Sequence, residues 1–205
     1  MPKLTIVLWF VFLAISLGVR ILIQLRMTGR TGFVLSRPGS SPLQLFASVL
    51  FLSSVALGVA SPILAALLPL QPWAAWNTSA SLPLIGGIVY LSGVSLAFAA
   101  QLTLGRSWRV GVDVNERTEL VVRGAFSVVR NPIFSALFLT AIGLAMLCST
   151  LLAWVACAVQ LVALEIQVRA VEEPYLARVH GDAYRAYVAR VGRFVPGLGL
   201  RTRSI

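Results

Sequence analysis

The longest uncharged stretch of the chain restricts its possible folds more than any other feature. No Asp, Glu, Lys or Arg occurs from residue 38 to residue 105, and none occurs from residue 131 to residue 164. A helix of about 20 apolar residues crosses the hydrocarbon core of a bilayer. Only 12% of all residues are charged, against about 25% in an ordinary soluble domain. The sequence therefore predicts an integral membrane protein built from α-helices.

The lengths of the apolar stretches predict five transmembrane helices. Three stretches each have the length of one crossing, namely residues 4–25, 43–70 and 82–104. A fourth, residues 133–168, contains 36 residues, which is too long for one crossing and just long enough for two. It predicts a C-terminal helical hairpin, followed by amphipathic helices in the cytoplasm. The expected fold class is all-α.

The positions of the arginines indicate the orientation in the membrane. They occur in the loop after the first span, in the loop before the hairpin and in the C-terminal tail, whereas residues 71–81 and the hairpin turn carry no charge. Because Lys and Arg concentrate on the cytoplasmic side, we expect an outside N-terminus and a cytoplasmic C-terminus, in a plasma (inner) membrane. The net charge of +10 then predicts contact with anionic lipid headgroups and not with nucleic acid.

The sequence predicts no metal site. Its single histidine is His180, and both cysteines, Cys148 and Cys157, lie inside apolar stretches, where a cysteine acts as a small hydrophobic residue. Small residues recur at roughly helical spacing in the third span, at Gly86, Gly93, Ala97 and Ala100. Such residues allow a second helix to approach closely.

Several residues in the last third of the chain predict helix boundaries. Pro132 is expected in the first turn of the fourth span, with Asn131 as its cap. The fifth helix is expected to continue beyond the membrane surface until Gly181 breaks it, and Tyr184 and Tyr187 are spaced to share one helix face.

Polar chemistry is confined to residues 104–134 and to the tail that begins at residue 168. In the tail, two of the seven acidic residues are adjacent, Glu172 and Glu173, directly after the apolar stretch. Carboxylates on a helix that faces a basic, glycine-containing loop form a pocket with both signs of charge, which suits a zwitterionic ligand. The alternative is that both glutamates only pair with surrounding arginines.

Three segments in order resemble the isoprenylcysteine carboxyl methyltransferase and phospholipid methyltransferase families. They are RGAFSVVRNPIFSA, then VEEPYL about 30 residues later, then HGDAYRAYVARVGRFVP. The resemblance covers residues 104–196, nearly half of the chain. It implies two parts: residues 1–104 with three N-terminal transmembrane helices, and residues 105–205 as a cofactor-binding methyltransferase core.

The resemblance implies S-adenosylmethionine as the cofactor and assigns residues to it. The adenosine side is expected to be lined by Thr118, Glu119, Leu120, Val121 and Phe126. A wall of the pocket is expected from Asn131, Pro132, Ile133 and Phe134. Glu172 is expected to meet the positive amino group of the cofactor, and Glu173 to support it by pairing with arginine. The arginine position that recognises the substrate in the family is Val168 here, so Arg169 becomes the catalytic candidate.

The chain departs from the family pattern at several positions. Asn131 replaces a histidine, Phe126 and Phe134 replace tyrosines, and Ala136 replaces a glycine. The asparagine retains hydrogen-bonding capacity but does not titrate near neutral pH.

The resemblance implies methyl transfer from S-adenosylmethionine to a lipophilic acceptor that enters from the bilayer. The acceptor is either an isoprenylcysteine-type carboxylate or a lipid-like small molecule. Two alternatives stay open: an NADPH-dependent membrane reductase with a similar C-terminal half, and a non-enzymatic membrane scaffold with a degenerate cofactor motif. The oligomeric state does not follow from the sequence.

Overall fold

The computed structural model of the protein describes residues 1–32, 41–68, 81–110 and 119–201. Its elements in chain order are α1 (Pro2–Leu13), the π-helical turn η1 (Ala14–Val19), α2 (Arg20–Thr28), α3 (Pro42–Leu67), α4 (Ser81–Leu104), the 3₁₀ turns η2 (Gly105–Ser107) and η3 (Gly124–Ser127), α5 (Pro132–Cys148), α6 (Leu151–Ile166), the π-helical turn η4 (Gln167–Glu172) and α7 (Glu173–Val188). Apart from an isolated bridge between Val129 and Gly192, the described residues contain no strand pairing. The predicted all-α fold is confirmed.

The long helices have the dimensions and the surface of a membrane bundle. Among the described residues, four helices are long and apolar enough to cross a membrane: Pro2–Thr28, Pro42–Leu67, Ser81–Ser107 and Leu151–Val188. α5 has 17 residues and reaches about 26 Å at a rise of about 1.5 Å per residue, close to the about 30 Å of the hydrocarbon core. Large apolar side chains on the outer faces are exposed, among them Phe10, Phe46, Val49, Leu84 and Leu91.

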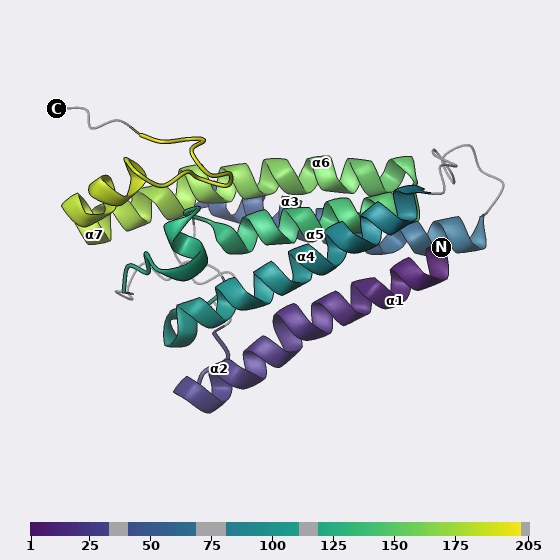
Figure 1. Ribbon diagram of the computed structural model, residues 1–205, viewed down its shortest axis with the longest axis horizontal. Helices are drawn as coiled ribbons and strands as arrows, with labels where there is room; N and C mark the ends of the chain where they lie inside the picture. Colours follow the sequence, from purple (N-terminus) through teal and green to yellow (C-terminus); the bar gives the residue numbers. More distant parts are fainter. Residues whose placement is uncertain (33–40, 69–80, 111–118, 202–205) are drawn as a thin grey trace.

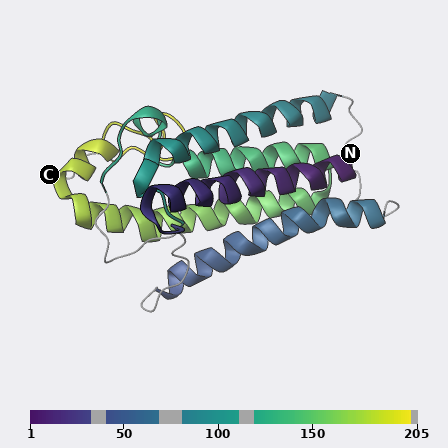
Figure 2. The ribbon, with the colours of Figure 1, turned by 90° about the horizontal axis from the view of Figure 1, so that it is seen from below.

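The helices form two tightly packed pairs, α4 with α5 and α3 with α6, and α1 lies across them (Figure 1). Figure 2 shows α1 between α3 and α4. The N-terminus lies at one end of the bundle and α7 at the other (Figure 1), as an odd number of crossings requires. The bundle with a C-terminal hairpin is therefore as predicted, although α5 is shorter than the other spans.

The hairpin between α5 and α6 turns within two residues. Ser149 adopts the left-handed conformation with φ of 54°, and the Thr150 side chain accepts a hydrogen bond from the Ala153 amide at 3.2 Å. Ser61 of α3 lies 2.5 Å from Thr150 Oγ1 and 3.4 Å from Cys148 Sγ. These buried polar contacts fix the turn to α3, because unsatisfied hydroxyls are costly at membrane depth.

Small residues let α4 and α5 pack with their backbones almost in contact, as predicted for the third span. A Cβ atom added at Gly93 would lie 2.4 Å from Thr140 Oγ1, and one added at Gly143 would lie 2.5 Å from the Tyr90 amide nitrogen. Ala97 and Ala100 are fully buried.

Gly93→Val is therefore expected to separate α4 from α5 and to destabilise the protein by about 1–3 kcal/mol or more, the usual cost of overpacking. Thermal unfolding in detergent micelles measures this loss. Gly87→Val is the matched control, since an added Cβ at Gly87 meets nothing within 4 Å and the change in helix propensity is the same. Equal melting temperatures for the two variants would contradict the close packing.

Candidate functional site

The polar segments of the chain meet at the end of the bundle opposite the N-terminus (Figure 1). α7 packs its Tyr184, Tyr187 and Val188 into a small apolar cluster, which Leu120 from the 119–131 segment completes. The Tyr187 hydroxyl donates to the Phe126 carbonyl at 2.5 Å. The predicted shared face of Tyr184 and Tyr187 is confirmed, and Gly181 kinks α7 with φ of 51°, as predicted from its position.

Glu173 is the centre of a buried ion cluster. It is 1% exposed, and Arg193 holds both of its oxygens, with Nε at 2.7 Å from Oε1 and Nη2 at 3.0 Å from Oε2. Arg130 Nη2 donates to Oε1 at 2.9 Å, and Arg201 lies 3.0 Å from Oε2. Burial alone would raise the pKa of Glu173, but hydrogen bonds from Arg193 and Arg130 lower this pKa below its ordinary value. Glu173 therefore stays ionised and is fully engaged within the protein.

Arg130 ties the C-terminal tail to the start of α5. Its Nη1 donates to the Val191 carbonyl at 2.5 Å, and its Nη2 donates to the Gly199 carbonyl at 3.0 Å. The tail reaches these positions by folding back on itself at Gly192, where an added Cβ would lie 2.2 Å from the Val195 carbonyl oxygen. Only glycine fits there.

Asn131 also binds the tail. Its amide nitrogen Nδ2 donates to the Arg193 carbonyl at 3.2 Å, and its backbone N–H donates to the same oxygen at 3.1 Å. Asn131 occupies the predicted N-cap position of α5, but its side chain forms no capping hydrogen bond, because its amide group binds the tail instead. Pro132 lies in the first turn as predicted. Ser135 extends the contact by donating to the Phe194 carbonyl at 2.7 Å.

Glu172 differs from Glu173 in its ion pairing and in the direction of its pKa shift. The apolar part of α6 ends at Leu164, and Glu172 follows about two turns later, in η4 and beyond the membrane span. Its side chain is half-buried, receives one hydrogen bond from Gln167 Nε2 at 3.3 Å, and forms no ion pair with any described residue. Burial raises the pKa of Glu172 to about 7, against the opposing effects of the Gln167 hydrogen bond and the charge of Arg109. Its carboxylate therefore has no ion-pair partner among the residues that the structure describes.

A cation from the preceding loop lies near this carboxylate. Arg109 Nη2 donates to the Tyr175 hydroxyl at 3.3 Å, and its Cζ lies 5.6 Å from the centre of the Tyr175 ring. Tyr175 is two residues beyond Glu173 in α7. The contact joins the loop after α4 to α7 and places a positive and a negative group at one site.

The geometry can be compared with known proteins. The family model for phospholipid methyltransferases matches residues 82–183, about half of the chain. The chain belongs to the phospholipid methyltransferase family. This match includes Arg109, Arg130, Glu172 and Glu173, and it ends before Arg193.

One solved structure has a fold similar to that of this chain. The eukaryotic intramembrane Ras methyltransferase ICMT (isoprenylcysteine carboxyl methyltransferase) superposes with a TM-score of 0.64 at 22% identity, over 97% of this chain and 68% of that chain. At this identity the similarity concerns the fold. No curated protein matches the chain by sequence. The family match and the shared fold identify the chain as a membrane methyltransferase relative.

Most of the predicted cofactor residues belong to the chain segment that carries Arg130, and their assignment to the cofactor stays a prediction. Phe126, Asn131 and Pro132 flank Arg130 in the chain. Phe126 and Pro132 are buried, and Val121, Ile133 and Phe134 are partly buried. Leu120 packs against α7, Glu119 is exposed, and Thr118 lies outside the described residues.

Arg169 was predicted to be the catalytic residue of this chain. Its side chain is exposed and pairs with Glu165, one turn earlier. The structure records no contact between Arg169 and Glu172. Its assignment as the residue that recognises the substrate stays a prediction.

Sequence reasoning missed the arginines that hold the ion cluster together. Arg130 and Arg193 are the first residues of the recognised stretches RNP and RFVP, but nothing in their spacing indicates one shared carboxylate 20 to 43 residues away. Gln167 and Tyr175 were also missed. Their positions next to the glutamate pair on the same helix were the available signal.

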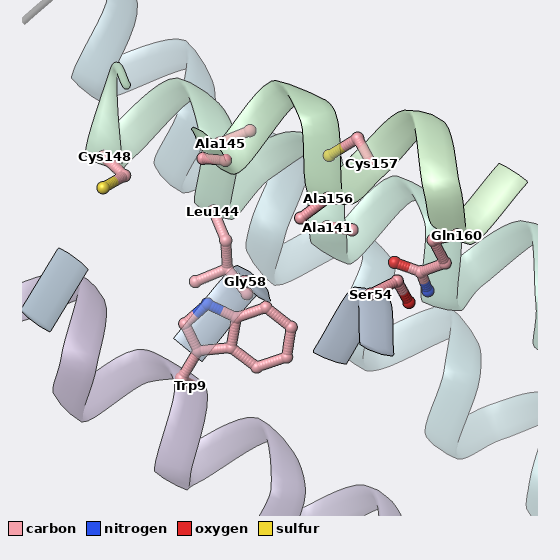
Figure 3. Close-up of a pocket in the computed structure, with 11 residues that line it drawn as sticks. Trp9, Ser54, Gly58, Ala141, Leu144, Ala145, Cys148, Ala156, Cys157 and Gln160 are labelled. Atoms are coloured by element: carbon pink, nitrogen blue, oxygen red, sulfur yellow. The ribbon is translucent and has the colours of Figure 1, made fainter. Parts of the chain in front are cut away.

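A separate crevice lies within the membrane bundle, between α1, α3, α5 and α6 (Figure 3). Trp9 packs against Gly58 on one side, and Cys148, Cys157 and Gln160 lie on the other. It has room for about one water molecule, and no charged residue lines it. Its distance along the bundle from the glutamate pair makes it part of the packing of the methyltransferase fold and not of the polar site.

Proposed function

We propose that the protein transfers a methyl group from S-adenosylmethionine to a lipophilic acceptor. The observation that carries this proposal is the contrast between the two adjacent glutamates. Glu173 is neutralised by three arginines, whereas Glu172 is half-buried with no ion pair among the described residues. A cationic ligand group supplies the missing partner.

The residues at the site fit the amino-acid part of S-adenosylmethionine. Glu172 suits its ammonium group, and Arg109, whose charge already acts on Glu172, suits its carboxylate. When bound, the sulfonium group of the cofactor supplies an already activated methyl group. The protein then has to hold the acceptor in line with it, and positioning of this kind contributes about 7–11 kcal/mol to catalysis.

The position of Glu172 after the apolar part of α6 favours a lipophilic acceptor. Glu172 follows the last apolar turn of α6, so a ligand lying in the bilayer brings its head to the level of the carboxylate. The polar cofactor enters from the aqueous side. An isoprenylcysteine-type carboxylate and a lipid-like small molecule both fit this division.

The orientation that we propose places this end of the bundle in the cytoplasm of a cell whose plasma (inner) membrane holds the protein. Exposed arginines surround the site, namely Arg26, Arg30, Arg106, Arg123, Arg178 and Arg190, and they suit anionic lipid headgroups on the cytoplasmic leaflet. An epitope tag after Ile205 that is accessible from outside intact cells would contradict this orientation.

Calorimetric titration of the purified protein tests the cofactor. S-Adenosylhomocysteine is expected to bind and NADPH is not. Binding of NADPH alone would favour the reductase alternative, and binding of neither would favour a scaffold. Incubation with S-adenosylmethionine carrying a deuterated methyl group and a lipid extract, followed by mass spectrometry, then identifies the acceptor by its mass gain.

The affinity for S-adenosylhomocysteine is expected to depend on pH through Glu172. The ligand amino group favours the ionised carboxylate, so a pKa of about 7 in the free protein means that acidification weakens binding. Between pH 8 and pH 6 the affinity should fall by roughly tenfold, since one pH unit below the pKa leaves about one carboxyl in ten ionised. Calorimetry over this range measures the slope. Glu172→Gln should remove it, and an unchanged slope in that variant would assign the proton to another group.

A further inference from the structure

Arg20 is a fully buried cation that pairs with no carboxylate of the described residues. It is 0% exposed and lies inside the first membrane helix. Its Nη2 donates to the Gly105 carbonyl at 2.5 Å, and its Cζ lies 4.6 Å from the centre of the Trp108 ring. Nε and Nη1 find no acceptor, and none of the described Asp or Glu side chains contacts the guanidinium. An arginine at such a depth usually has a function.

The neighbours of Arg20 are also incompletely paired. Gln101 Nε2 donates to the Ser16 carbonyl at 3.1 Å, and Gln24 Nε2 donates to the Arg106 carbonyl at 2.9 Å. These bonds fix the orientation of both amides and leave both Oε1 atoms without a donor, and Ser16 Oγ has no partner either. All of these side chains are at most 4% exposed. Buried polar groups in native proteins are nearly always paired, so these unpaired atoms are available to polar atoms of a ligand or to water.

The chain builds this cluster through the register of its first helix. Ser16, Arg20 and Gln24 are spaced by four residues and face successive parts of α4 and η2, which lie beside α1 and α2 (Figure 1). The π-helical turn η1 ends directly before Arg20. π-Helical turns occur frequently at functional sites, because they change the direction of the following side chains.

We propose that Ser16, Arg20, Gln24 and Gln101 form a binding site for an anionic oxygen group, a carboxylate or a phosphate, carried by an amphiphile in the bilayer. Guanidinium groups bind both oxygen groups through paired N–H donors. The two glutamine oxygens accept hydrogen bonds from water or from a hydroxyl group of the same ligand. Trp108 covers the guanidinium. The proposal does not depend on methyl transfer.

Native mass spectrometry of the detergent-solubilised protein tests this site with three amphiphiles. Phosphatidylglycerol offers a phosphate, oleate offers a carboxylate, and phosphatidylcholine is the zwitterionic reference. The parent protein is expected to bind at least one of the first two more tightly than phosphatidylcholine. Tighter binding of phosphatidylglycerol would identify the anionic group as a phospholipid phosphate, and tighter binding of oleate would identify it as a carboxylate.

Arg20→Gln should weaken this binding by ten- to a hundredfold, the usual effect of losing a charge-assisted hydrogen bond. Lys3→Gln is the control: it removes one positive charge from an exposed position at the opposite end of the same membrane helix and should change binding less than about twofold. Equal binding by the parent and Arg20→Gln would overturn the proposal, as would a parent protein that does not distinguish the three amphiphiles and holds only water here.

A second variant keeps the test decisive if Arg20→Gln does not fold. Gln101→Glu is isosteric and supplies an internal carboxylate one helical turn before Gly105, whose carbonyl binds the guanidinium. It should abolish binding of the anionic amphiphile and leave the protein folded. Retention of that binding in folded Gln101→Glu would also overturn the proposal.

Discussion

Glu173→Gln is expected to lower the stability of the protein more than any other single change at the polar site. The substitution leaves Arg130 and Arg193 buried with no counter-charge, and their side chains are 2% and 9% exposed. Removal of one partner from a buried ion pair costs about 3–5 kcal/mol. For a chain of this length, each kcal/mol corresponds to about 2–4 °C, so we expect the melting temperature in detergent to fall by roughly 10 °C.

Asp182→Asn is the control for this experiment. Asp182 pairs with Arg185 on the exposed surface of α7, and exposed pairs contribute about 0–1 kcal/mol. The two variants should also differ in acid. Because the pKa of folded Glu173 lies below its ordinary value, its contribution to stability is present above that ordinary value and is lost as the pH falls through the lowered pKa. The parent protein and Asp182→Asn should show this loss, and Glu173→Gln should not. Similar melting temperatures for both variants would mean that the ion cluster contributes little.

Glu172→Gln is expected to lower the affinity for S-adenosylhomocysteine by ten- to a hundredfold while the fold persists. A hydrogen bond to a charged group contributes about 1.5–3 kcal/mol, and Glu172 is half-buried without an ion pair among the described residues. Calorimetric titration measures the loss. Glu165→Gln is the control, since Glu165 pairs with exposed Arg169 one helical turn away, and it should bind almost as the parent does.

Although Glu172→Gln is expected to bind the ligand more weakly, the variant protein is expected to be more stable than the parent at high pH. Burial raises the pKa of Glu172 to about 7, so ionisation of the folded protein is costly. Stability falls as the pH rises from the ordinary glutamate value to about 7. The neutral glutamine avoids this cost, and at pH 8 the variant should melt at a higher temperature than the parent. A residue whose replacement weakens binding and strengthens the fold serves the ligand. Reduced stability together with reduced binding would instead give Glu172 a structural role.

The sequence determines the membrane part of this fold to a large extent. Uncharged runs, small residues in α4 and a 36-residue apolar stretch depend only on local composition, so they predicted the bundle, the close approach of a second helix to α4 and the hairpin. They did not predict that α5 is this second helix. The division into residues 1–104 and 105–205 stays a prediction. The sequence also located the glutamate pair as an unusual feature, because acidic residues are few.

The details of the polar site depend on the path of the tail, which the sequence does not specify. Asn131 was predicted to cap α5, but its amide binds the Arg193 carbonyl, a partner 62 residues away. Arg130 and Arg193 meet at Glu173 only because the chain turns back at Gly192. Long-range contacts of this kind leave no periodic pattern in the sequence, and neither do the two π-helical turns.

Those two π-helical turns determine how far the following helices are rotated about their own axes. Each ends directly before one of the most deeply buried charged residues, η1 before Arg20 and η4 before Glu173. A π-helical turn holds one more residue than the corresponding α-helical turn, and one residue corresponds to about 100° of rotation. The direction in which Glu173 points is therefore set by the number of residues in the segment before it and not only by their identity. Loss of a single residue from Gln167–Glu172 would rotate α7 relative to α6 and carry Glu173 away from its arginines without altering any side chain of the ion cluster.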